Sequence, residues 1–121
     1  MEIGIIGSGD VGQHLAKLLI KKGFEVKMSN SRGPESLETL ATDLGIIPSN
    51  TQEVAKSSIV ILAVRREDIM RILKTVTFND NILVDATNQM KLDDFEFGSR
   101  LVATHASNAH VVKAFNTLYA R

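Results

Sequence analysis

The stretch EIGIIGSGDVGQHLAKLLIKKGFEVKMSNS, residues 2–31, decides the fold of this chain. Residues 2–6 form a short apolar run that ends in glycine, as a buried parallel strand does. Residues 11–22 place valine and leucine on one face of a helix, and residues 24–29 alternate apolar with polar side chains. A strand, a glycine turn, a helix and a second strand within about 30 residues form the βαβ unit that binds dinucleotides. The stretch therefore predicts a nucleotide site at its first turn.

The first turn carries three glycines with the spacing G-x-G-x-x-G. Gly7 permits a tight turn, Gly9 lets the backbone approach a pyrophosphate, and Gly12 lets the helix pack closely on the strand. The pyrophosphate would lie on N–H groups at the positive end of the helix dipole. Asp10 is interpreted as the cap of this helix. The alternative is that the glycines serve only to pack the helix against the strand.

An acidic residue normally follows such a glycine turn by about 20 residues and binds the ribose hydroxyls of NAD. In this chain the corresponding positions hold Asn30, Ser31 and Arg32. An acid would repel a 2′-phosphate, whereas Arg32 is a planar, permanently charged donor. Asn30 and Ser31 can add neutral hydrogen bonds to the phosphate. The pattern favours NADP(H) as the cofactor, and the alternative is a solvated arginine in a turn.

The rest of the chain continues the alternation of strands and helices. The periodicity predicts helices over residues 34–45, 50–56 and 69–76, a weak helix over 99–107, and strands over 45–49, 59–64, 82–86 and 111–115. Asn50 and Glu53 are expected to form a capping pair for the helix over 50–56. Strands separated by helices imply right-handed crossovers. The expected fold is therefore α/β, a doubly wound parallel sheet of the Rossmann type with strand order 3-2-1-4-5-6. With 121 residues, the chain is expected to be a single domain over 1–121.

Composition narrows the function classes. The formal net charge is zero, so no broad field attracts nucleic acid or an anionic membrane. The chain has no cysteine, which excludes disulfides and thiolate catalysis and fits a reducing compartment. The longest apolar run, residues 59–64, is too short to cross a bilayer, and Ile3 begins the first apolar run without room for a leader. A soluble, cytoplasmic domain is expected.

The sequence shows neither the pattern of a metal site nor the motif of a catalytic side chain. His105 and His110 have no nearby acid and no third ligand at a recognisable spacing, so no metal site is expected. No motif of a catalytic nucleophile is present. The sequence therefore identifies no catalytic residue, and this assignment is unknown.

The N-terminal residues, extended to IGIIGSGDVGQHLAKLLIKKGFEVKMSNSRGPESL (3–37), resemble the NADP oxidoreductases that reduce or oxidise the deazaflavin coenzyme F-420. The segments IVILAV (59–64), VDATN (84–88) and VVKAFNT (111–117) occur in the same order in that family. The resemblance implies that the pyrophosphate turn is lined by Ser8, Asp10 and Val11. It implies that Ser31 and Arg32 hold the 2′-phosphate, and that the residues toward the nicotinamide are Thr87, Asn88 and Asn116. Metalloreductases with a cytosolic NADPH domain are a more distant likeness.

The end of the fourth predicted strand adds Val64 and Arg65 to the expected cofactor site. Family members commonly have a proline where this chain has Arg65. One interpretation is that Arg65 and Arg66 flank the adenine or its phosphate. The alternative is that these two residues begin a solvated helix.

The function expected from this resemblance is hydride transfer between NADPH and a deazaflavin (F-420) or flavin-like acceptor. The two cofactors would supply the chemistry, and the protein would align their rings and exclude water. The alternative is a non-catalytic domain that senses or regulates through bound NADP(H). Family members continue past AFNT, so a C-terminal segment is expected to be absent here. The chain by itself is then expected to bind NADPH and to turn over slowly, unless a homodimer formed at the last strand completes the site.

Overall fold

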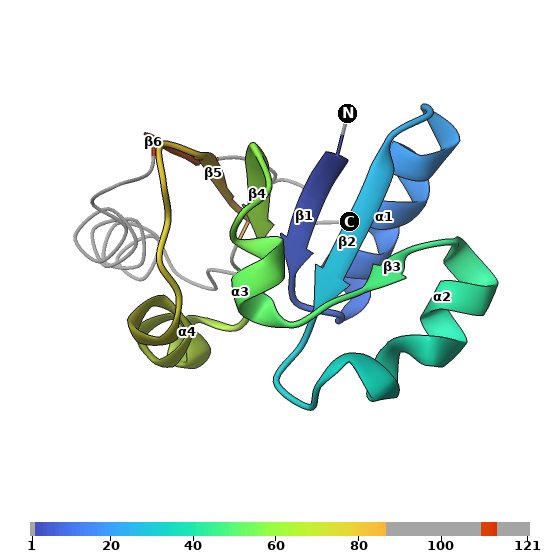
Figure 1. Cartoon of the computed structure of the whole chain (residues 1–121), viewed down its shortest axis with the longest axis horizontal. Coiled ribbons are helices and arrows are strands. Elements are labelled where there is room, and N and C mark those ends of the chain that lie inside the picture. The colour runs from blue at the N-terminus through green and yellow to red at the C-terminus, as the bar shows by residue number, and fades with distance from the viewer. Residues whose placement is uncertain (1, 87–109, 114–121) are drawn as a thin grey trace.

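The computed structural model describes residues 2–86 and 110–113, in which six strands form one parallel sheet. The strands are β1 (Glu2–Ile6), β2 (Glu25–Ser29), β3 (Ile47–Pro48), β4 (Ile59–Leu62), β5 (Ile82–Asp85) and β6 (His110–Lys113). Their order is β3-β2-β1-β4-β5-β6 (Figure 1). The predicted doubly wound sheet with strand order 3-2-1-4-5-6 is therefore confirmed.

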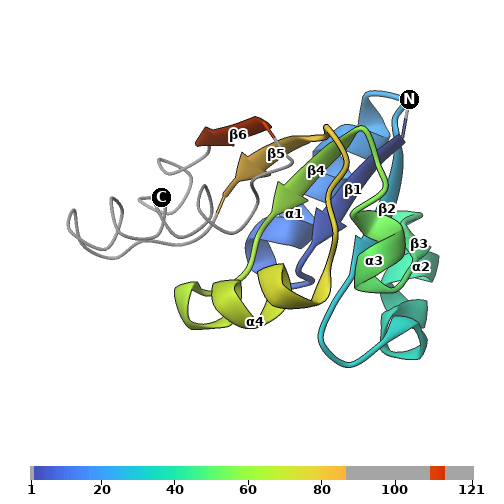
Figure 2. The ribbon, with the colours of Figure 1, turned by 60° about the vertical axis from the view of Figure 1, so that its left-hand side comes forward.

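Helices cover both faces of this sheet. They are α1 (Asp10–Lys21), the 3-10 turn η1 (Pro34–Leu37) followed by α2 (Glu38–Leu44), α3 (Thr51–Val54), and the 3-10 turn η2 (Arg66–Asp68) followed by α4 (Ile69–Thr75). Figure 2 shows α1 on one side of the sheet and α3 and α4 on the other. Because successive strands of a parallel sheet need such crossovers, this arrangement follows from the alternating sequence pattern.

The core consists of two apolar clusters, one on each face of the sheet. On β4, Val60 and Leu62 pack under α3 and α4, while Ile61 packs toward α1. On β1, Ile3 and Ile5 pack toward α1 and Ile6 packs on the opposite face. A strand whose two faces are both covered by helices must be apolar at every position, which explains the unbroken run in β4.

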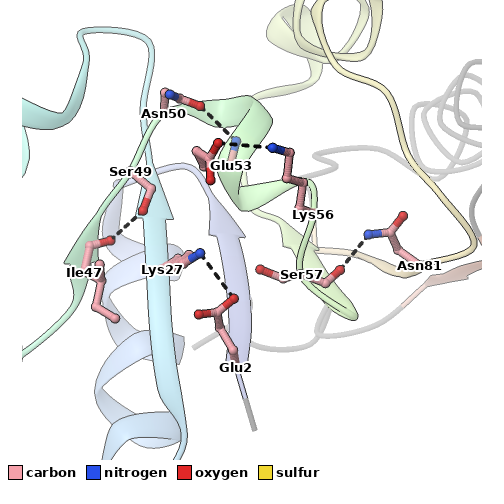
Figure 3. A network of polar contacts seen from close by, with 9 residues as sticks. All are labelled: Glu2, Lys27, Ile47, Ser49, Asn50, Glu53, Lys56, Ser57 and Asn81. Carbon is pink, nitrogen blue, oxygen red and sulfur yellow. Dashed lines mark hydrogen bonds and ion pairs between the residues drawn. The ribbon is translucent and has the colours of Figure 1, made fainter.

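Several element ends differ from those predicted. The segment predicted as one helix over 34–45 begins as η1 and becomes α-helical only at Glu38, and Gly45 ends it at φ +85°. Strand β3 is limited to two residues, and α4 ends at Thr75. The predicted cap at Asn50 is confirmed, because its side chain accepts the Glu53 N–H at 2.8 Å (Figure 3). The weak helix predicted over 99–107 lies outside the described residues.

A buried amide holds the opposite end of the sheet, away from the carboxyl ends of the strands. Asn81 is 4% exposed, and its Nδ2 donates to the carbonyl oxygens of Ala55 (2.7 Å) and Ser57 (2.6 Å). Figure 3 shows the contact with Ser57, which joins the turn before β5 to the connection before β4. Lys27 and Glu2 pair across β2 and β1 at 3.3 Å. These bonds fix the frame from which the loops at the other edge extend.

Candidate functional site

The carboxyl ends of three central strands meet at one edge of the sheet. Ile6, the last residue of β1, is in register with Ser29 of β2 and with Leu62 of β4. The Gly7 N–H donates to the Ser29 carbonyl at 2.8 Å, and the Ala63 N–H donates to the Ile6 carbonyl at 2.9 Å. The loops that follow these strands therefore leave the sheet side by side. In an open α/β sheet, this edge is where ligands bind.

A pocket of about 300 Å³ opens between these loops. It brings together eight residues that the sequence assigned to a cofactor site, namely Gly7, Ser8, Gly9, Asn30, Ser31, Arg32, Val64 and Arg65. The other lining residues are Ile6, Thr51, Ala63, Asp68, Arg71, Ile72 and Thr75. A volume of this size is at the lower end of pockets that hold small molecules and cofactors.

One side of the pocket was missed by the sequence analysis. This side is formed by the face of η2 and α4 that carries Asp68, Arg71, Ile72 and Thr75. These positions follow the spacing i, i+3, i+4, i+7, which places side chains on one face of a helix. That spacing, in a helix that follows a central strand, was the signal that could have found them.

The three glycines of the first turn have different surroundings. A Cβ at Gly7, whose φ is +121°, would lie 2.2 Å from the carbonyl oxygen of Ala63. A Cβ at Gly12 would lie 2.4 Å from the carbonyl oxygen of Gly7. A Cβ at Gly9 would meet nothing within 4 Å. Gly7 and Gly12 are therefore required by the packing of the chain on itself, and the packing places no such requirement on Gly9.

Helix α1 begins at the rim of this pocket without a side-chain cap. Its N-cap is Gly9, and Asp10 is an exposed residue of the first turn whose side chain accepts no capping hydrogen bond. The interpretation of Asp10 as the helix cap is therefore wrong. Gln13 Nε2 donates to the Ser8 carbonyl at 2.8 Å and so fixes the glycine turn from the helix side. An uncapped helix N-terminus next to a glycine turn is suited to an anion.

Three arginines line the pocket, and they differ in their charge partners. Arg65 Nη1 lies 3.8 Å from Glu67 Oε1, and Arg71 Nη2 lies 3.3 Å from Asp68 Oδ1. Within the described part of the chain, Arg32 pairs with no carboxylate. The Arg32 side chain is exposed, and the residue lies in the loop that directly follows β2. The arrangement therefore offers a ligand one arginine whose charge is not compensated by a described neighbour.

The remaining predicted residues lie in other places. Asp10, Val11 and Gly12 do not line the pocket, and Val11 is half-buried against the core beneath α1. Asn30 lines the pocket, but its amide is bonded to neighbouring loop atoms rather than directed at a ligand. The positions predicted to face the nicotinamide, Thr87, Asn88 and Asn116, lie outside the described residues.

His110 has an acidic neighbour that the sequence analysis did not find. Its Nε2 lies 2.6 Å from Asp80 Oδ1, because the pairing of β6 with β5 brings together residues 30 positions apart. No acid stands at a recognisable sequence spacing from His110, and it is the pairing of the strands that brings Asp80 to it. Across residues 2–86 and 110–113, no three metal-binding side chains gather in one place. Across the same residues, no helix has the length and apolar character needed to cross a membrane.

Comparison with known proteins identifies relatives over most of the chain. The family model described as "NADP oxidoreductase coenzyme F420-dependent" matches residues 2–89. The uncharacterized oxidoreductase YfjR of Bacillus subtilis is 28% identical over 88% of this chain and 38% of its own length. Metalloreductase STEAP3 of Rattus norvegicus is 29% identical over 98% of this chain and 25% of its own length. The chain thus spans less than two-fifths of these curated relatives.

Solved structures share the fold as well. A hypothetical protein of Sinorhizobium meliloti, SMa0349, is 30% identical and superposes with a TM-score of 0.83, covering 96% of this chain and 62% of that one. The family model covers well over half of the chain, including the glycine turn, the loop after β2 and the end of β4. The chain therefore belongs to the family of coenzyme F420-dependent NADP oxidoreductases.

Proposed function

We propose that residues 1–121 form a single NADP(H)-binding domain, and that the pocket at the carboxyl edge of the sheet binds this cofactor. The observation that carries the proposal is Arg32, which lines the pocket with no described carboxylate partner, in a loop that lacks the acid of NAD-binding proteins. Guanidinium groups bind phosphate with two parallel hydrogen bonds. The same pocket contains Gly9, beside which there is open space for a ligand.

The shape of the site suggests how the cofactor would lie. We place the pyrophosphate against Gly7, Ser8 and Gly9 and the N-terminus of α1, because the N–H groups there lack a side-chain cap. We place the 2′-phosphate against Ser31 and Arg32. Asp10, Val11 and Gly12 would shape the turn from behind, since none of them lines the pocket.

The adenosine would lie across the pocket from the glycine turn. Val64 and Arg65 follow β4 on one side, and the face of α4 with Arg71 and Ile72 lies beyond them. Apolar Val64 and Ile72 can pack against a planar base, while the arginines supply positive charge around the phosphates. Thr87, Asn88 and Asn116 are predicted to lie toward the nicotinamide.

We propose that the domain serves hydride transfer between NADPH and a deazaflavin (F-420) or flavin-like acceptor. Bound NADPH supplies the hydride, so the residues of the chain need only hold the ring in place and exclude water. Family membership and the oxidoreductase names of its relatives support this reaction class. A non-catalytic domain that senses NADP(H) is the second candidate, because the pocket described here contains groups for binding but no acid–base pair assigned to catalysis.

The cofactor assignment predicts a preference that can be measured directly. The protein should bind NADPH at least about tenfold more tightly than NADH, because each charge-assisted hydrogen bond to the 2′-phosphate contributes about 1.5–3 kcal/mol. Titration calorimetry with both nucleotides at the same ionic strength measures the ratio. Equal affinity for the two nucleotides would contradict the assignment.

The reaction assignment predicts turnover that depends on the acceptor. Mixing the protein with NADPH and the deazaflavin should oxidise NADPH, and a free flavin serves as the second acceptor in a parallel stopped-flow experiment. Sedimentation of the same samples shows whether turnover accompanies a homodimer joined at β6, the edge strand of the described sheet. NADPH binding without oxidation by either acceptor would favour the sensing role.

A further inference from the structure

The loop that carries Arg32 is organised around the side chain of Asn30. The Oδ1 atom of Asn30 accepts hydrogen bonds from the backbone N–H groups of Arg32 and Gly33, each at 3.0 Å. The Nδ2 group donates to Ser36 Oγ at 2.8 Å and to Ser8 Oγ at 3.3 Å. An asparagine that bonds the backbone two residues ahead forms an Asx turn, which fixes the local backbone without a helix or strand. Asn30 thus fixes the residues on both sides of its turn.

Ser36 closes this arrangement from the opposite side. Its hydroxyl donates to the Gly33 carbonyl at 2.7 Å and accepts the N–H of Asn30 Nδ2, and its backbone N–H also donates to the Gly33 carbonyl at 3.2 Å. Ser36 belongs to η1, and the next residue, Leu37, is fully buried in the core. The loop is therefore anchored to the interior of the domain through a single short turn.

The hydrogen-bonding capacity of Asn30 is filled by these contacts. An asparagine amide has two donor hydrogens and one carbonyl oxygen that accepts two bonds, and here all four are used. A phosphate would have to displace one of these bonds to reach Asn30, whereas Ser31 and Arg32 are exposed and line the pocket. The role of Asn30 is thus to place its neighbours rather than to contact the ligand, which differs from the direct phosphate bond expected from the sequence.

We propose that Asn30 and Ser36 are positioning residues that form the 2′-phosphate site before the nucleotide arrives, and that they thereby set the preference for NADPH over NADH. This inference rests on the proposed function. A loop that is already ordered loses less conformational entropy when it binds, so its affinity is higher for the same contacts. The bond from Asn30 to Ser8 also joins this loop to the glycine turn.

If Asn30 and Ser36 position the 2′-phosphate site, replacing them should lower the affinity for NADPH and not the affinity for NADH. A general destabilisation of the fold would lower both affinities. Replacing Asn30 with alanine removes every hydrogen bond of the amide and should lower NADPH affinity about tenfold, while NADH affinity changes less than about twofold. Ser36→Ala removes one hydroxyl and should give a smaller loss, of about three- to fivefold, also confined to NADPH. Ser36→Thr keeps the hydroxyl and should retain the wild-type ratio.

The Asn30→Asp variant tests separately the hydrogen bonds that Asn30 accepts within its turn and those that it donates to Ser8 and Ser36. Asn30→Asp keeps an oxygen that can accept from the Arg32 and Gly33 N–H groups, but it loses both donors and adds a negative charge beside the phosphate. NADPH affinity should fall more than in the alanine variant. NADH affinity should be retained or improved, because a carboxylate at the end of the second strand can accept from ribose hydroxyls.

The experiment is titration of NADPH and of NADH into the wild type and each variant, with circular dichroism and thermal unfolding to verify folding. Thr42→Ala is the matched control, since it deletes a hydroxyl that bonds a backbone carbonyl on α2 away from the pocket. Amide exchange in the nucleotide-free protein adds a direct measure, because the Arg32 and Gly33 N–H groups should be protected in the wild type and exposed in Asn30→Ala.

Each outcome has a distinct meaning. The inference is supported if Asn30→Ala and Ser36→Ala lower the affinity for NADPH but not for NADH, and if Ser36→Thr keeps the wild-type ratio of the two affinities. If the wild type prefers NADPH but folded Asn30→Ala and Ser36→Ala keep that preference, the inference is overturned and the proposed function stands. If the variants lose both nucleotides equally, the inference is also overturned. A wild type without any preference would contradict the proposed cofactor itself.

Discussion

Replacing Gly9 with valine should abolish the binding of both NADPH and NADH, a loss on the order of 100-fold or more, while the protein stays folded. The protein itself leaves room for a Cβ at Gly9, which would meet nothing within 4 Å. Gly9 has φ −76° and ψ −170°, an extended conformation that valine adopts readily. The added isopropyl group would occupy the space proposed for the pyrophosphate. Both nucleotides carry that group, so both should be lost.

The neighbouring glycine provides the control for this prediction. Gly12→Ala would place a Cβ 2.4 Å from the Gly7 carbonyl oxygen, so it should lower the free energy of unfolding by about 1–3 kcal/mol. Gly9→Val should change that free energy by about 1 kcal/mol or less, because Gly9 is the exposed N-cap of α1, a position that valine does not favour. Titration and chemical denaturation of the two variants measure both quantities. Normal nucleotide binding by a folded Gly9→Val would show that the glycine turn is only structural.

Replacing Arg32 with alanine should lower NADPH affinity about ten- to 100-fold and change NADH affinity less than about twofold. The reason is that the guanidinium is proposed to bind the 2′-phosphate, which NADH lacks. Within the described residues, no carboxylate pairs with Arg32, so its removal leaves no described acid without a partner. Parallel titrations of NADPH and NADH into the variant measure the two changes.

Loss of one positive charge needs its own control. Lys56→Ala removes a charge of the same sign from an exposed side chain that pairs with Glu53 and does not line the pocket. It should leave both affinities within about twofold of the wild type. An equal loss of NADPH and NADH in Arg32→Ala would refute the assignment of Arg32 to the 2′-phosphate. It would place the arginine near a part of the cofactor that both nucleotides share.

Much of this architecture could be predicted from the sequence because it depends on local pattern. The apolar run of β4 indicated a strand buried on both faces, and the alternation of strands and helices gave the order of the parallel sheet. Asn50 before α3 was recognised by its capping chemistry. The loops at the carboxyl ends of β1, β2 and β4 could also be assigned to one site, because parallel strands end at the same edge.

The three-dimensional structure was needed wherever the role of a residue depends on atoms far along the chain. The spacing of the glycines does not distinguish Gly9 from Gly7 and Gly12, because the difference lies in whether a carbonyl oxygen occupies the space of a Cβ. From the sequence alone, Asn30 was expected to donate a hydrogen bond to the phosphate. In the structure its amide is bonded instead to Ser8 in the glycine turn and to Ser36 in η1, which no local pattern reveals.

The same reason applies to the face of α4 and to His110. The side chains of Asp68 and Arg71 follow a helical period, but only the packing of α4 against the sheet decides that this face borders the pocket. The contact of His110 with Asp80 exists because β6 pairs with β5. Sequence patterns report periodicity and local turn chemistry, and these determined the fold and the edge at which the site lies. Distances between separate segments are set only when the sheet assembles, and they decided which residue at that edge faces a ligand and which one holds its neighbours in place.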